Sequence, residues 1–195
     1  MHVKIEAIAG CIPERSVTSS EVEQTLRTYN PELPVPSGII ESLTEIHSRQ
    51  FVDDEDASDL ASRAASVALE KSGLTPADID LLIFASASQD LVEPATSHIV
   101  QSKLGTQCQV FDLKNACNSF LNAIQVAEAM IRAGSHRRVL VATGETCSKT
   151  IRWKLDSSRD FRDYFIGYTL GDAGAAAILA RQTRRAASII TRTGR

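Results

Sequence analysis

Residues 111–120 read FDLKNACNSF and join two kinds of sequence pattern. A strand-like apolar run ends at Leu113, and an apolar helical pattern begins at Cys117 and continues to Ala133. The pattern therefore predicts a thiol at a strand-to-helix junction. The first turn of a helix has unpaired N–H groups and about half a positive charge, which favour the thiolate of a cysteine placed there. The same N–H groups are suited to stabilise an oxyanion formed when sulfur attacks a thioester.

The segments around this stretch alternate between strand and helix patterns. The alanine-rich repeat from Ala57 to Leu69 predicts a helix that Gly73 ends, and the acidic cluster before it suits helix capping better than metal binding. A second helix is expected to follow Pro94, a residue that suits a first helical turn, and to run to Leu104 before it stops at Gly105. Apolar runs predict strands at residues 3–13, 79–88, 108–113, 137–145, 174–181 and 186–193. This alternation predicts an α/β fold with a largely parallel sheet, whose functional groups gather beyond the carboxyl ends of the strands.

Composition narrows the class of protein. The 195 residues carry a net charge of −3, and the only basic cluster lies at the tail, so we expect no nucleic-acid partner. The chain has no run of about 20 apolar residues and no apolar segment typical of a signal peptide, so we expect neither a membrane span nor export. Its four cysteines are scattered without metal-ligand spacing. These features indicate a cytoplasmic protein with reduced thiols, no metal and no bound cofactor.

Five segments, taken in order, resemble the amino-terminal half of β-ketoacyl-acyl-carrier-protein synthase III and its relatives in the thiolase superfamily. FDLKNACNSF is similar to the nucleophile motif of that family, in which Ala-Cys follows an apolar strand and an aspartate. The other four segments are GLTPADIDLLIFASAS (73–88), EPATSHIVQSKLG (93–105), RRVLVATGET (137–146) and TLGDAGAAAIL (169–179). The resemblance covers the chain from about Ile5 to Ile190.

The resemblance implies a particular architecture. The chain is expected to form the amino-terminal half of a five-layered α/β/α/β/α sandwich with a mixed, mostly parallel sheet. Residues 1–182 would form this thiolase-like half, and residues 183–195 would begin the second half. The family takes a catalytic histidine and asparagine from that second half. A longer polypeptide or a separate chain is therefore expected to supply them, and the edge strand CQVFDL (108–113) is expected to pair across the two-fold axis of a homodimer.

The resemblance also implies acyl transfer. Cys117 would take an acyl group from acyl-CoA or acyl carrier protein, and a second acyl thioester would then attack that group in a Claisen condensation. Two residues depart from the fatty-acid initiating enzymes, which usually carry glycine at the position of Ser119 and an aromatic residue at that of Glu93. A carboxylate before Pro94 resembles the branch that joins two acyl thioesters head to head in the olefin pathway.

Glu93 is the second candidate catalytic residue. In this family its loop crosses the dimer interface and lines the acyl pocket of the partner. Without a malonyl group, no loss of CO₂ creates the carbanion, so a base must remove an α-proton. The hypothesis is that Glu93 of one subunit is this base at Cys117 of the other. The alternative is that Glu93 is an ordinary loop carboxylate at the interface, without a catalytic role.

Two other functions stay open on the sequence. The first is a malonyl-dependent, decarboxylative synthase of fatty-acid or polyketide initiation. The second is a non-catalytic subunit that supports a complete ketosynthase, which the missing histidine and asparagine would favour.

Overall fold

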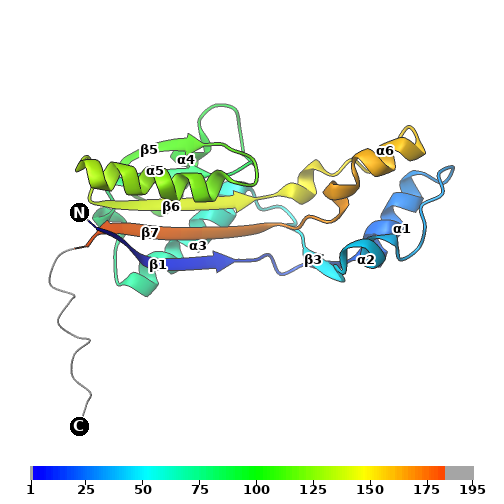
Figure 1. The fold of residues 1–195 in the computed structure, drawn as a ribbon, viewed down its shortest axis with the longest axis horizontal. Helices are drawn as coiled ribbons and strands as arrows, with labels where there is room; N and C mark the ends of the chain where they lie inside the picture. Colours follow the sequence, from blue (N-terminus) through cyan, green and yellow to red (C-terminus); the bar gives the residue numbers. More distant parts are fainter. Residues whose placement is uncertain (1, 183–195) are drawn as a thin grey trace, which may run out of the picture.

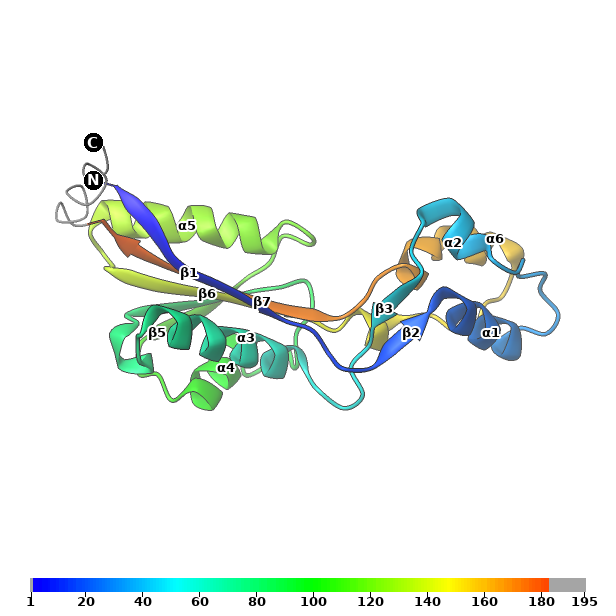
Figure 2. The ribbon, with the colours of Figure 1, turned by 90° about the horizontal axis from the view of Figure 1, so that it is seen from below.

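The computed structural model describes residues 2–182, which form a sheet-based body and a smaller lobe at one end of it (Figures 1 and 2). The body contains a five-stranded sheet in the order β1-β7-β6-β4-β5. Its strands are β1 (Val3–Cys11), β4 (Leu81–Ala85), β5 (Gln109–Leu113), β6 (Arg138–Glu145) and β7 (Ala173–Arg181). These strands confirm the sequence predictions, except that the run at residues 186–193 lies outside the described residues.

Strand direction explains where a site can form. β4 pairs in parallel with both β5 and β6, whereas β7 pairs antiparallel with β6 and β1. Among the described strands of this sheet, β7 alone therefore runs the other way, and the sheet is mixed and mostly parallel as expected. All five residues of β4 are buried, which accounts for its uninterrupted apolar sequence. β5 lies at one edge, also as expected.

Helices cover both faces of the sheet. Figure 2 shows α3 and α4 on one face and α5 on the other. Their bounds are α3 (Ala57–Ser72), α4 (Thr96–Leu104) and α5 (Ser119–Ala133). The predicted capping of α3 is confirmed, because Asp56 and Asp59 form a reciprocal capping box and Gly73 ends the helix in the left-handed conformation.

Two helices begin later than the sequence pattern indicates. Pro94 lies before α4 instead of inside its first turn, because Ala95 is the N-cap and the helix starts at Thr96. Cys117 likewise precedes α5, whose N-cap is Asn118. The apolar pattern of α5 extends back to Cys117, whereas its regular helical backbone begins only at Ser119.

The smaller lobe has its own core. It consists of β2 (Ser16–Thr18), α1 (Ser19–Tyr29), α2 (Ile39–Thr44), β3 (Ser48–Gln50), η2 (Cys147–Thr150), α6 (Ser158–Asp163) and η3 (Phe165–Tyr168). The buried carboxylate of Glu23 accepts the N–H groups of Gly38 (2.7 Å) and Ile40 (2.9 Å), so it caps α2 from α1. The sequence predicts the helix that begins at Ser19 and a short helix within residues 37–50, whereas α6, the 3₁₀ segments and the two three-residue strands are too short for periodicity to reveal them.

The body leaves several large apolar side chains uncovered. α5 lies over the sheet face opposite α3, and on the outer strand β1 the side chains of Ile5 and Ile8 are 48% and 58% exposed. Leu121 on α5 is 62% exposed. Within residues 2–182, no helix combines the length and apolar character that crossing a bilayer requires.

Gly144 on β6 sets the distance between the sheet and α3. A Cβ atom at this position would overlap the carbonyl oxygen of Ala57 and lie 3.0 Å from the backbone nitrogen of Ala61. We predict that Gly144→Ala lowers the free energy of unfolding by about 3 kcal/mol, because backbone atoms must move to admit the methyl group. Urea denaturation measures the change. Gly167→Ala is the matched control, since its added Cβ would meet open space; equal stability of the two variants would contradict the prediction.

Candidate active site

Three loops meet at one end of the sheet because β4, β5 and β6 are parallel. The loop after β4 spans residues 86–95, the loop after β5 spans residues 114–118, and η2 follows β6. Figure 1 shows the first two loops at the end to which the arrows of β5 and β6 point. This is the end of an α/β sheet at which ligands bind.

Cys117 lies on a tight elbow between β5 and α5, and its side chain is exposed. Ala116 before it has φ of 48°, in the left-handed region that alanine rarely adopts. Such a conformation costs about 1–3 kcal/mol and persists only where the surroundings impose it. No side chain caps the amino end of α5 in the described chain. The thiol therefore stands just outside the helix, beside its uncapped amino end, and not within its first turn.

Ser119 imposes this conformation and was missed as a functional residue. Its buried hydroxyl accepts the N–H of Asn115 (2.8 Å) and donates to the carbonyl oxygen of Ala116 (2.7 Å). The elbow is thus closed by two hydrogen bonds that bracket Cys117. A serine in place of the usual glycine of the family was the available signal, but the hydrogen-bond partners of a side chain cannot be inferred from its residue type.

Asp112, in the same motif, connects β5 to the loop that carries Glu93. Its carboxylate accepts the N–H of Thr96 (3.1 Å) and the N–H of Ser97 (2.8 Å), the first two residues of α4. A carboxylate at this place also complements the positive end of the helix. The strand that leads to Cys117 therefore fixes the end of the loop that contains Glu93.

Glu93 is exposed at the tip of that loop, next to Leu91 and Val92, which are 53% and 83% exposed. The Glu93–Pro94 peptide bond is cis. Across residues 2–182, no hydrogen bond or ion pair joins Glu93 to Cys117 or to another side chain. The structure thus places both candidate residues at the same end of the sheet, but it does not bring them together within one chain.

Cys147 is a third thiol at this end of the sheet. Burial raises the pKa of Cys147 to about 11, and the charges of Glu145, Asp172 and Cys117 act in the same direction. Because Cys117 contributes to this shift, the two thiols lie near each other. Cys147 therefore stays protonated near neutral pH.

Histidine is not part of this arrangement. His47 contacts Glu41 and His136 contacts Ser135, whereas His98 on α4 is exposed to solvent. In the part of the chain that the structure describes, no histidine bonds to Cys117. The described residues also contain no group of three or more metal-ligating side chains.

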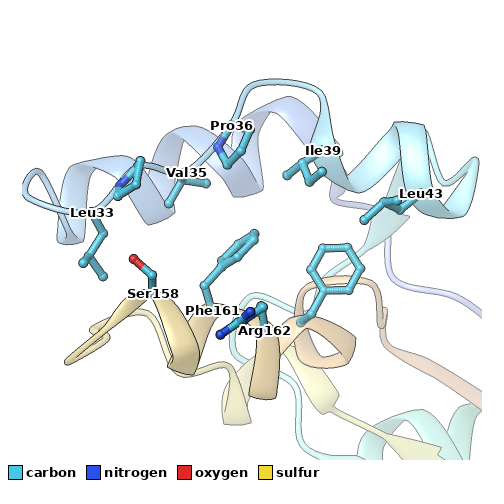
Figure 3. Close-up of a pocket in the computed structure, with 10 residues that line it drawn as sticks. Leu33, Val35, Pro36, Ile39, Leu43, Ser158, Phe161 and Arg162 are labelled. Carbon is cyan, nitrogen blue, oxygen red and sulfur yellow. The ribbon is translucent and has the colours of Figure 1, made fainter.

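A separate apolar pocket of about 610 Å³ lies in the smaller lobe (Figure 3). One wall comes from the segment before α2 and from α2 itself, and the other comes from α6 and η3. Figure 3 shows Phe161 pointing toward Val35 and Ile39 across the opening. The remaining lining residues are Leu33, Pro34, Pro36, Leu43, Ser158, Arg162 and Phe165. Its surface suits an alkyl group, with one cation among the lining residues.

Comparison with known proteins agrees with this geometry. The family model for 3-oxoacyl-[acyl-carrier-protein (ACP)] synthase III matches residues 111–193. The β-ketoacyl-[acyl-carrier-protein] synthase III of Vesicomyosocius okutanii is 32% identical over 177 residues, which cover 91% of this chain and 52% of that protein. The acyl-CoA:acyl-CoA alkyltransferase of Xanthomonas campestris is 32% identical over 190 residues, covering 92% and 56%.

Solved structures give the same result for the fold. A crystal structure of a Xanthomonas campestris OleA variant bound with cerulenin superposes with a TM-score of 0.85 at 31% identity. It covers 93% of this chain and 57% of that one. Another OleA variant gives a TM-score of 0.84 at 32% identity.

The mixed sheet and the cysteine at its strand-to-helix elbow define a member of the thiolase superfamily. Within it, the chain belongs to the β-ketoacyl synthase III-like condensing-enzyme family, which also contains OleA. The chain spans about half the length of the curated relatives it matches.

We predict that iodoacetamide at pH 8 modifies Cys117 and leaves Cys147 unmodified, because alkylation requires thiolate and Cys147 has a pKa of about 11. Modification of Cys147 should rise as the pH approaches 11. Peptide mass spectrometry across this pH range measures both thiols in the same sample. Equal labelling of the two at pH 8 would contradict the assigned environment of Cys147.

Proposed function

We propose that the protein condenses two acyl thioesters, with Cys117 as the acyl-accepting nucleophile. The observation that carries the proposal is the exposed thiol on a hydrogen-bonded elbow beside the uncapped amino end of α5. The sulfur attacks the thioester carbonyl of acyl-CoA or acyl carrier protein. A new C–S bond forms, and the carrier leaves as its thiol. N–H groups at the amino end of α5 are placed to stabilise the intermediate oxyanion.

The second step is proposed to be non-decarboxylative. Glu93 of one subunit removes the α-proton of a second acyl thioester held at the other subunit. The resulting carbanion attacks the acyl group on Cys117, so a C–C bond forms and the C–S bond to Cys117 breaks. The product is a β-ketoacyl thioester. Support comes from the exposed position of Glu93 and from the resemblance to a family that includes an acyl-CoA:acyl-CoA alkyltransferase. Neither step requires a metal or a bound cofactor.

The proposal requires a homodimer and a second α/β half. The loop of Glu93 projects with apolar side chains at its tip, which suits insertion into a partner subunit. The uncovered apolar side chains of Ile5, Ile8 and Leu121 suit burial against the second half, which would also supply a histidine and an asparagine. The four free cysteines support a cytoplasmic location for the enzyme.

Two alternatives have distinct outcomes. A malonyl-dependent synthase would require malonyl thioester and release CO₂ with each condensation. A non-catalytic subunit would leave Cys117 without an acyl adduct after incubation with long-chain acyl-CoA.

Separate measurement of the two steps tests the catalytic assignments. We predict that Cys117→Ala abolishes the acyl adduct, whereas Glu93→Gln keeps the adduct on Cys117 and abolishes condensation, because the amide cannot accept the α-proton. Intact-protein mass spectrometry reports the adduct and product analysis reports condensation. Loss of both steps in Glu93→Gln, or of neither, would remove Glu93 from the role of base.

The elbow itself can be tested through Ser119. We predict that Ser119→Ala slows acylation of Cys117 about tenfold, because two hydrogen bonds of about 1 kcal/mol each no longer fix the backbone at Ala116. Ser66→Ala is the matched control, since it removes a hydroxyl that bonds the backbone of α3 away from the site. Equal acylation rates in the two variants would show that the elbow does not depend on Ser119.

A further inference from the structure

The start of the loop that carries Glu93 is bound to the end of β6, residue by residue. The Ser86 hydroxyl donates to the carbonyl oxygen of Gly144 (2.8 Å), and the N–H of Thr146 donates to the Ser88 hydroxyl (3.1 Å). The parallel pairing of β4 with β6 ends at Phe84 and Ala142. Beyond that point, side chains continue the connection between the two strands.

Glu145 is the centre of this connection. Its Oε1 accepts the N–H of Ala87 (2.8 Å), while its Oε2 accepts the N–H (3.1 Å) and the hydroxyl (2.8 Å) of Ser88. Three donors thus converge on one half-buried carboxylate. Hydrogen bonds to a charged acceptor are about twice as strong as neutral ones. The conformation of the loop where it leaves β4 therefore depends on this carboxylate.

The other end of the loop is fixed independently. The N–H of Asp90 donates to the buried Thr96 hydroxyl (3.2 Å), and Asp112 binds the first N–H groups of α4. Residues 91–94 between these anchors make no hydrogen bond within the described chain. The position of the segment that contains Glu93 is therefore set by the hydrogen bonds at the two ends of the loop and not by hydrogen bonds of the segment itself.

We propose that Glu145 is a positioning residue, which sets where the loop presents Glu93 to Cys117 of a second copy of this chain. The inference rests on the proposed function, because it assigns Glu145 a role through Glu93. Glutamine cannot replace it: with only one carbonyl oxygen, its amide group would turn N–H donors toward the N–H of Ala87 or of Ser88. Glu145→Gln therefore keeps the size of the side chain and disrupts the anchor.

The site suggests a competing role that the test must separate. The negative charge of Glu145 also faces Cys147, which is coupled to Cys117 in the same subunit. If Glu145 acted through that charge, the substitution would affect the thiol of its own subunit. If it acts through the loop, the effect appears at the partner's thiol.

The first measurement compares the two chemical steps in the complete native protein. Glu145→Gln is expected to acylate Cys117 at the unsubstituted rate and to lose condensation at least about tenfold, because misplacing a base by a fraction of an ångström is enough for that loss. Glu70→Gln, the same change on the exposed side of α3, is the control and is expected to affect neither step. Unchanged condensation in Glu145→Gln, with condensation lost in Glu93→Gln, overturns the inference and leaves the proposed function standing.

The second measurement uses mixed dimers of Glu145→Gln and Cys117→Ala subunits. In these dimers the only nucleophile lies in the Glu145→Gln subunit and faces the intact loop of its partner. Condensation is expected to return to about half of the unsubstituted level, as one of two sites is restored. No return overturns the inference in favour of an effect on the thiol of the same subunit.

A reference pair of Glu93→Gln and Cys117→Ala subunits completes the design. Recovery in this pair is expected, and it supports a base that acts across the dimer. If the reference pair stays inactive, the shared site is wrong, and the proposed role of Glu93 and the positioning role of Glu145 are overturned together.

Discussion

The parallel pairing of β4 with both β5 and β6 is the constraint on which the site depends. It brings the ends of three strands to one edge of the sheet, so residues far apart in sequence share one place. Two carboxylates then fix the positions of the segments that follow these strands. Asp112 holds the start of α4, and Glu145 holds the start of the loop after β4. Ser119 does the same for the elbow of Cys117.

Backbone groups and side chains provide hydrogen bonds in different parts of the sheet. The interior of the sheet satisfies its polar groups by regular pairing, so β4 needs only apolar side chains. Where the strands end, N–H groups lose their partners, and charged or hydroxyl side chains replace them. The same residues that complete the hydrogen bonding therefore determine the shape of the site. In this protein, stability of the loops and placement of the reacting groups are not separate properties.

The sequence predicted the strands of the sheet and the position of Cys117 between a strand and a helix, because both leave strong local patterns. Long apolar runs marked β4 and β6, and the Ala-Cys junction marked the elbow. The start of α5 was misplaced by two residues, since apolar periodicity cannot report the left-handed backbone of Ala116. In the smaller lobe, α6 was not predicted because a helix of six residues shows no apolar period. The roles of Ser119 and Glu145 depend on partners that only the folded chain supplies.

The smaller lobe has a consequence for how such a chain can diversify. Its pocket is lined by residues 33–43 and 158–165, and its apolar core is distinct from the two that flank the sheet. Substitutions there alter the volume and shape of the cavity without changing the strands β4, β5 and β6. The cavity and the edge of the sheet that carries Cys117 can therefore vary independently of each other during evolution.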